Sequence, residues 1–137
     1  SYTYEKFKQY SSIGYNLERW PEKLQIQDFI ILCCALSKTS HHIINEDTIN
    51  LMKQGVRIIN VGRGGLIDQD ALESGLKNKH INSVALDVFE NEPPDIKSYL
   101  VNHPLSILGS HNASNTKDAV ERTSILSIEL ISKMLTK

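Results

Sequence analysis

The sequence predicts an α/β fold in which a parallel sheet has helices on both faces. Four short apolar runs, typical of buried strands, alternate with segments that have helical caps and helical spacing. The links between them are short, which favours the strand–helix–strand connections of parallel sheets. Ligands of such sheets bind at the carboxyl ends of the strands. Functional residues are therefore expected just after each strand.

The predicted strands are residues 29–34, 56–61, 83–88 and 106–109. The first is a continuous apolar run, as expected for a strand that is covered on both faces. Its Cys33 and Cys34 are therefore predicted to lie in the core rather than to act as nucleophiles. A fifth strand is expected at residues 1–4, with only its last residues present.

Helices are predicted over residues 46–53, 69–78, 95–101 and from 116 to near the C-terminus. Asn45, Asp68 and Asn115 are the predicted N-caps of the first, second and last of these, because their side chains can accept a hydrogen bond from a free backbone N–H. Pro21 breaks any longer helix near the N-terminus and is suited to open a short one.

Composition and charge exclude several classes of function. The 137 residues fit one domain. The net charge is -1 and the sequence has no run of Lys or Arg, so binding to nucleic acid or to an anionic membrane surface is not predicted. No membrane span or signal peptide is predicted. The adjacent Cys33 and Cys34 are poor disulfide partners, which favours a reduced, cytoplasmic location. His41, His42 and His80 have no acidic or cysteine neighbours at metal-ligand spacing, so no metal site is predicted.

A glycine-rich loop with one arginine follows the second predicted strand. In Gly62-Arg63-Gly64-Gly65 the glycines allow a sharp turn and leave room for a ligand to approach the backbone. Arg63 would project its planar guanidinium into the crevice, where it can hold a carboxylate in two hydrogen bonds. The alternative is a surface arginine in a turn, and the loop alone does not decide between the two.

His111 follows the fourth predicted strand, and Glu92 lies in the loop after the third. A free imidazole has a pKa of about 6.5, so His111 can give or take a proton at neutral pH. A hydrogen bond from Glu92 to one ring nitrogen would fix the tautomer and direct the other nitrogen to a substrate. Without that contact both are solvated loop residues, and Glu90 is a rival for the role of Glu92.

Asp87 interrupts the apolar third strand near its carboxyl end. A buried carboxylate is costly unless it is paired or hydrogen-bonded. Asp87 is therefore either a structural acceptor of hydrogen bonds or a polar group facing the ligand crevice, and its place at the end of the strand favours the crevice.

Several motifs, and their order along the chain, resemble those of the D-isomer-specific 2-hydroxyacid dehydrogenases. They are Ala35-Leu36-Ser37 with Ser40, residues 59–68 (Ile-Asn-Val-Gly-Arg-Gly-Gly-Leu-Ile-Asp), Ala85-Leu86-Asp87-Val88-Phe89 with Glu92-Pro93, and His111 with Thr116. The resemblance extends from about Phe29 to Thr116. It implies a Rossmann-like fold and an NAD-dependent oxidoreductase that interconverts a D-2-hydroxy acid and a 2-oxo acid.

The resemblance also implies roles for individual residues. Arg63 matches the arginine that binds the substrate carboxylate, His111 the acid/base, and Glu92 the carboxylate that supports this histidine. The implied cofactor-binding residues are Cys34, Ala35, Val61, Gly62, Asp87 and Ala113. The implied substrate is a small 2-hydroxy or 2-oxo acid, and the expected assembly is a homodimer.

The chain also departs from the family pattern. It has no Gly-x-Gly-x-x-Gly loop to seat a pyrophosphate at a helix N-terminus, and this loop is expected upstream of Ser1. Residues 1–115 are therefore predicted to be a dinucleotide-binding domain that is incomplete at its N-terminus. Residues 116–137 are predicted to form a helix that packs towards a substrate domain outside this chain. Glu5 is a candidate for the acidic residue that holds the ribose.

A function of a different class stays open, namely a dinucleotide-sensing scaffold for protein partners with little or no catalysis. The joint presence of Arg63, Glu92 and His111 argues against it, because a scaffold needs neither a carboxylate clamp nor an acid/base pair. The chain alone is expected to be inactive.

Overall fold

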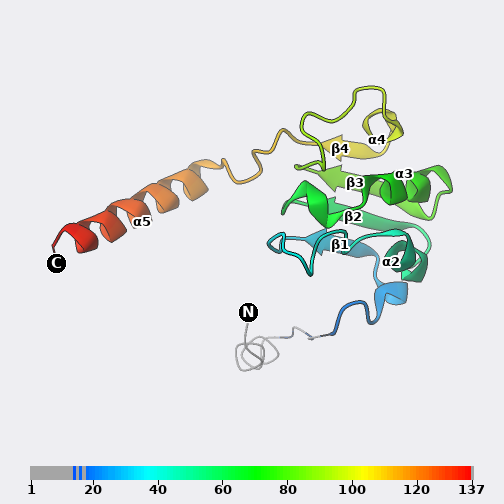
Figure 1. Ribbon diagram of the computed structural model, residues 1–137, viewed down its shortest axis with the longest axis horizontal. Coiled ribbons are helices and arrows are strands. Elements are labelled where there is room, and N and C mark those ends of the chain that lie inside the picture. The colour runs from blue at the N-terminus through cyan, green and yellow to red at the C-terminus, as the bar shows by residue number, and fades with distance from the viewer. Residues whose placement is uncertain (1–13, 15, 17, 137) are drawn as a thin grey trace.

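A computed structural model describes residues 14, 16 and 18–136, and its strands form one parallel sheet (Figure 1). The strands are β1 (Phe29–Leu32), β2 (Val56–Asn60), β3 (Ile81–Leu86) and β4 (Ser106–Leu108), and they lie side by side in chain order. The four predicted strands and the α/β class are confirmed. The expected strand at residues 1–4 lies outside the described residues, as does Glu5.

Helices connect the strands in the order that the sequence predicts. They are α2 (Glu46–Leu51), α3 (Gln69–Lys77), α4 (Tyr99–Asn102) and α5 (Lys117–Leu135), with short 3-10 helices η1 (Leu24–Ile26) and η2 (Gly64–Leu66). α2 and α3 are the crossover helices from β1 to β2 and from β2 to β3. Such crossovers place the carboxyl ends of the strands at one edge of the sheet.

Two of the predicted caps are confirmed and one is wrong. Asn45 accepts a hydrogen bond from the Thr48 N–H, and Asp68 accepts one from the Ala71 N–H. The last helix is capped by Thr116 instead of Asn115, because Asn115 belongs to a preceding turn in which its N–H donates to the Asn112 carbonyl.

Two predicted helices are shorter than expected. The helix predicted over 46–53 ends at Leu51 because Met52 has an extended backbone. The helix predicted within 95–101 begins only at Tyr99, because Ser98 has an extended backbone and its side chain caps the helix. Pro21 opens no helix, since residues 20–23 form a turn and η1 begins at Leu24.

In the described part of the chain, the helices cover one face of the sheet. Ile30 and Ile58 are buried in the core together with Leu72 of α3. On the other face, Phe29 is 54% and Ile31 61% exposed, so the expected second layer of helices is not found there. The prediction that Cys33 and Cys34 lie in the core is wrong: β1 ends at Leu32, and both cysteines are exposed.

Helix α5 extends away from the sheet (Figure 1) and has no buried residue. Its apolar side chains are exposed, among them Val120, Ile128, Ile131 and Leu135. Among the described residues, no helix combines the length and the apolar character needed to cross a membrane.

Candidate active site

All the predicted site residues follow the carboxyl end of a strand. Cys34 and Ala35 follow β1, residues 61–63 follow β2, Asp87 and Glu92 follow β3, and His111 and Ala113 follow β4. Because the four strands are parallel, these residues share one edge of the sheet. All of them except Ala113 line one of two hollows.

The first hollow is an open groove of about 460 Å³ between the ends of β1 and β2. It is lined by Cys33, Cys34, Ala35, Leu36, Val61, Gly62 and Arg63. A Cβ atom at Gly62 would lie 2.9 Å from the Cys34 carbonyl oxygen. The backbones of the two loops therefore approach more closely than any side chain at position 62 would allow.

Buried Asn60 shapes the glycine loop, and sequence reasoning missed it. Its side chain accepts a hydrogen bond from the Gly62 N–H at 3.0 Å and donates one to the Arg63 carbonyl at 2.9 Å. Only 1% of the residue is exposed. The available signal was an amide at the end of an otherwise apolar strand, because a buried polar side chain needs hydrogen-bond partners nearby.

Arg63 is exposed at the groove and only lightly held. Its Nη1 donates to the Gly62 carbonyl at 2.7 Å. None of the ion pairs among the described residues includes Arg63. Since a guanidinium has five N–H donors, most of them are left for a ligand.

The second hollow has a volume of about 260 Å³, lies between the ends of β3 and β4, and contains a His–Glu pair. His111 Nδ1 lies 2.9 Å from one carboxylate oxygen of Glu92, and the other oxygen accepts the Phe89 N–H at 3.0 Å. Phe89, Pro93 and Pro94 provide an apolar lining. His111 Nε2 has no hydrogen-bond partner in the part of the chain that the structure describes, so it is available to a ligand.

The hydrogen bond with His111, together with that from the Phe89 N–H, holds the pKa of Glu92 below its ordinary value. Glu92 is therefore ionised at neutral pH and can only accept a hydrogen bond. It follows that Nδ1 of His111 bears the proton in this pair, whether the ring is neutral or charged.

Asp87 fixes the loop that contains His111. Its two carboxylate oxygens accept the Ala113 N–H at 2.9 Å and the Asn112 N–H at 3.0 Å, and its carbonyl accepts the His111 N–H at 2.8 Å. The bond from Ala113, aided by that from Asn112, lowers the pKa of Asp87. Asp87 thus has the structural role that we considered, while it also lines the second hollow.

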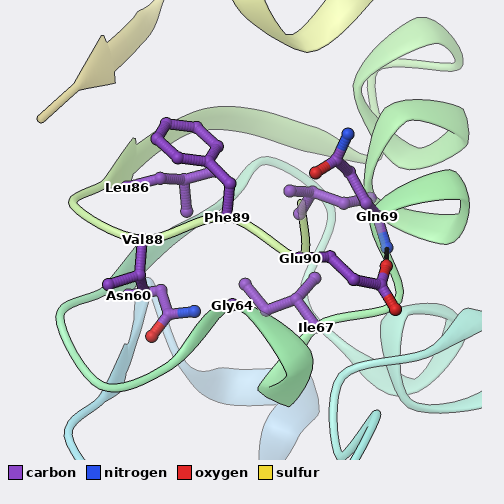
Figure 2. Close-up of a pocket in the computed structure, with 9 residues that line it drawn as sticks. Asn60, Gly64, Ile67, Gln69, Leu86, Val88, Phe89 and Glu90 are labelled. Carbon is purple, nitrogen blue, oxygen red and sulfur yellow. Dashed lines mark hydrogen bonds between the residues drawn. The ribbon is translucent and has the colours of Figure 1, made fainter. Parts of the chain in front are cut away.

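The two loops that bear Arg63 and Glu92 meet at Gly64. A Cβ atom at this position would lie 1.8 Å from the Phe89 carbonyl oxygen. Figure 2 shows Gly64, Phe89 and Glu90 around a pocket at this junction. Its volume is about 10 Å³, too small for more than a water molecule. Among the described residues, no hydrogen bond or ion pair joins Arg63 to Glu92 or His111.

Glu90, the rival of Glu92, has a different partner. One of its carboxylate oxygens lies 2.6 Å from His42 Nε2, a residue 48 positions earlier in the chain. His41 and His42 have no acidic neighbour at metal-ligand spacing along the sequence, as predicted from it, but the fold brings Glu90 into contact with His42.

A parallel sheet with helical crossovers and candidate ligand residues at its carboxyl edge is typical of open α/β domains, among them the dinucleotide-binding domains. Comparison with known proteins narrows this class. The model of the D-isomer specific 2-hydroxyacid dehydrogenase, NAD binding domain, matches residues 2–113. The chain belongs to this family, which confirms the resemblance and the NAD-binding class of domain.

Two relatives illustrate the relationship in sequence. D-3-phosphoglycerate dehydrogenase of Bacillus subtilis is 44% identical over 107 residues, which are 78% of this chain and 20% of that protein. Hydroxypyruvate reductase of Thermotoga maritima is 38% identical over 110 residues, which are 79% of this chain and 36% of that protein.

Solved structures confirm the Rossmann-like fold. A glyoxylate reductase from Paecilomyes thermophila matches with a TM-score of 0.77 and 35% identity, over 83% of this chain and 34% of that one. A D-lactate dehydrogenase from Aquifex aeolicus, complexed with NAD and lactic acid, matches with a TM-score of 0.70 and 30% identity, over 82% of this chain and 38% of that one. The chain thus spans well under half the length of these relatives.

Proposed function

We propose that the intact protein interconverts a D-2-hydroxy acid and a 2-oxo acid with NAD, and that this chain supplies the acid/base pair and the carboxylate clamp. The main support is the 2.9 Å contact between His111 and Glu92. Their hollow and the groove that contains Arg63 both follow the carboxyl ends of strands of one parallel sheet. Membership of the family supports the cofactor and the class of reaction.

The groove between β1 and β2 is the proposed place for part of the dinucleotide. The residues that would line it are Cys34, Ala35, Val61 and Gly62. Gly62 lets the loops after β1 and β2 approach each other closely beside this groove. NAD supplies the hydride acceptor when bound. Asp87 and Ala113 are proposed to serve the cofactor end of the site by fixing the loop of residues 111–113.

Arg63 is the proposed clamp for the substrate carboxylate. A carboxylate can replace the Gly62 carbonyl as the partner of Arg63 Nη1 and take a second hydrogen bond from the same fork. Such a bidentate pair fixes the orientation of a small acid as well as its position.

His111 is the proposed acid/base. When the hydroxy acid is oxidised, Nε2 takes the hydroxyl proton, and in the reverse direction Nε2 returns this proton to the carbonyl oxygen. The Glu92 carboxylate accepts from Nδ1–H throughout and stabilises the positive charge that the ring gains.

The test uses the intact protein with NADH and a panel of small 2-oxo acids. We expect turnover of at least one acid, and we expect His111→Ala to lower kcat by about 10²- to 10⁴-fold, the usual contribution of an acid/base. Arg63→Ala should lower kcat and raise KM. His103→Ala is the matched control, because His103 lies before β4, away from the carboxyl edge.

Full activity of both site variants would refute the residue assignment. Absence of turnover with every acid, together with NADH-dependent capture of a protein partner, would favour the scaffold instead.

We further propose that α5 packs towards a substrate domain, because its exposed apolar side chains need a partner surface. A cytoplasmic location is proposed because the adjacent Cys33 and Cys34 are poor disulfide partners. A homodimer is proposed on the family resemblance, and light scattering of the purified protein would test the assembly.

A further inference from the structure

Three potential metal ligands gather beside the site without a role in the proposed reaction. They are His41 and His42, in the loop after β1, and Glu90, in the loop after β3. One ligand atom from each lies within 4.8 Å of the others. His42 is partly buried, whereas His41 and Glu90 are exposed, so an ion can reach the cluster from solvent.

We propose that His41, His42 and Glu90 form a binding site for a divalent transition-metal ion, with Zn²⁺ as the best match. Two imidazoles and one carboxylate are ligands that Zn²⁺ accepts, and a water molecule can complete a four-coordinate shell. The inference does not depend on the proposed dehydrogenase activity, because it concerns residues outside the acid/base pair and the arginine loop.

The contact between His42 and Glu90 already brings two potential ligand atoms close to the separation that they would have around a metal ion. His42 Nε2 and a Glu90 carboxylate oxygen are 2.6 Å apart. A tetrahedral ion with bonds of about 2.0–2.1 Å would hold the same two atoms roughly 3.4 Å apart. The ion would take the place of the shared proton, and the two side chains would separate by less than about 1 Å.

His41 supplies the third ligand after a change of ring orientation. Its ring stacks on that of His42, with centroids 3.8 Å apart and an angle of 28° between the planes. Nearly parallel rings do not point their nitrogen lone pairs at one point, so the ring of His41 must rotate. Because His41 is exposed, this rotation meets little resistance.

The surrounding backbone holds the other two ligands in place. The His42 N–H donates to the Gly65 carbonyl at 2.9 Å, and the His42 carbonyl accepts from the Asn45 side chain at 3.0 Å. The second oxygen of Glu90 accepts the Gln69 N–H at 3.4 Å, a contact drawn in Figure 2. The bonds to the His42 backbone fix the position of its Cα, and the bond to Glu90 is of the kind that orients a carboxylate ligand at a metal site.

Titration calorimetry of the untagged chain with ZnCl₂ tests the site. The exposed Cys33 and Cys34 are first replaced by serine in every sample, because free thiols also bind Zn²⁺. We expect one saturable site. His42→Asn and Glu90→Gln should each weaken binding at least about tenfold, since even indirect loss of ligand support costs about 10- to 100-fold. His103→Asn is the matched control and should bind as the parent does.

His41→Asn keeps the test decisive if the other two variants fold poorly, because His41 is exposed. It should also weaken binding at least about tenfold. Two results would overturn the proposal: no saturable binding to the cysteine-free chain, or equal affinity of the parent and of the folded variants of the cluster. In either case His42 and Glu90 form only an ion pair between two loops.

Discussion

The acid/base part of the candidate site and its arginine differ in how firmly the chain holds them. His111 is fixed at its ring by Glu92 and at its backbone by the Asp87 carbonyl. The next two backbone amides are fixed by the Asp87 carboxylate. Among the residues that the structure describes, the Arg63 guanidinium makes one hydrogen bond, from Nη1 to the carbonyl of its own neighbour, Gly62.

This difference matches the demands of the two proposed roles. Proton transfer needs a donor and an acceptor at hydrogen-bond distance, so a fixed imidazole lowers the cost of reaching the reactive geometry. Binding of a carboxylate tolerates a mobile partner, because the long arginine side chain can follow its ligand. We therefore infer that the acid/base is preorganised and that the clamp closes on binding.

The largest effect is expected where the two parts meet. Gly64→Ala would place a methyl group 1.8 Å from the Phe89 carbonyl oxygen and push the two loops apart. We expect a destabilisation of about 3 kcal/mol, at the upper end of the cost of overpacking, together with loss of turnover. Gly65→Ala is the matched control, because its Cβ would meet side-chain atoms of Leu36 and His41, the nearest at 3.2 Å, and no backbone atom within 3.6 Å.

Urea denaturation of both alanine variants, monitored by circular dichroism, measures the difference between their free energies of unfolding. Equal stability of the two variants would show that the loops can separate freely, and the arginine and acid/base parts would then be independent of one another.

The second prediction concerns the firmly held His111–Glu92 pair. Glu92→Gln keeps the shape of the side chain but removes the negative charge that supports a protonated His111. We expect kcat to fall by about 10²- to 10⁴-fold, up to the loss for His111→Ala, with little change in KM. Steady-state kinetics of the intact protein decide this, and an unchanged kcat would mean that the pair has no part in proton transfer.

The third prediction concerns Arg63, the less firmly held part of the candidate site. Arg63→Lys keeps the charge but replaces the planar fork by a single ammonium group. We expect kcat/KM for the 2-oxo acid to fall roughly tenfold, about the value of one hydrogen bond to a charged group. The fall should appear mostly in KM. A fall confined to kcat would instead place Arg63 at the reacting carbonyl rather than at the carboxylate.

Local signals account for the parts of this structure that the sequence predicts well. Asn45 and Asp68 each cap a helix through a bond to the residue three positions later, so the pattern is visible in a short window. The order of strands and helices follows from similar local patterns. The cap at Thr116 was missed because Asn115, equally suited by residue type, is used by a turn.

Contacts between distant residues account for what could not be predicted. The pairing of His42 with Glu90 joins two loops 48 residues apart, and the approach of Gly64 to Phe89 depends on how β2 and β3 end. The exposure of Cys33 has a similar cause, since an apolar run does not reveal which of its faces a neighbour covers.

The smallest effect is expected from the pH dependence of stability. The pKa values of Asp87 and Glu92 lie below their ordinary values in the folded chain. Their hydrogen bonds therefore stabilise the fold above the unfolded pKa values of about 3.9 and 4.3, and this stabilisation is lost as the pH falls through the lower, folded values.

Asp87→Asn should lower the thermal midpoint by a few degrees at pH 7, because the amide offers one acceptor oxygen to two backbone N–H groups. The variant should also lose less stability than the parent between pH 6 and about pH 3. Asp28→Asn is the comparison away from the site: Lys53 lowers the pKa of Asp28, so this variant should also lose less stability than the parent at low pH, but it leaves the hydrogen bonds of the histidine loop in place. If Asp87→Asn and the parent have parallel melting curves over this range, the Asp87 carboxylate does not hold the histidine loop, and the rigidity of His111 must rest on Glu92 and on the Asp87 backbone carbonyl.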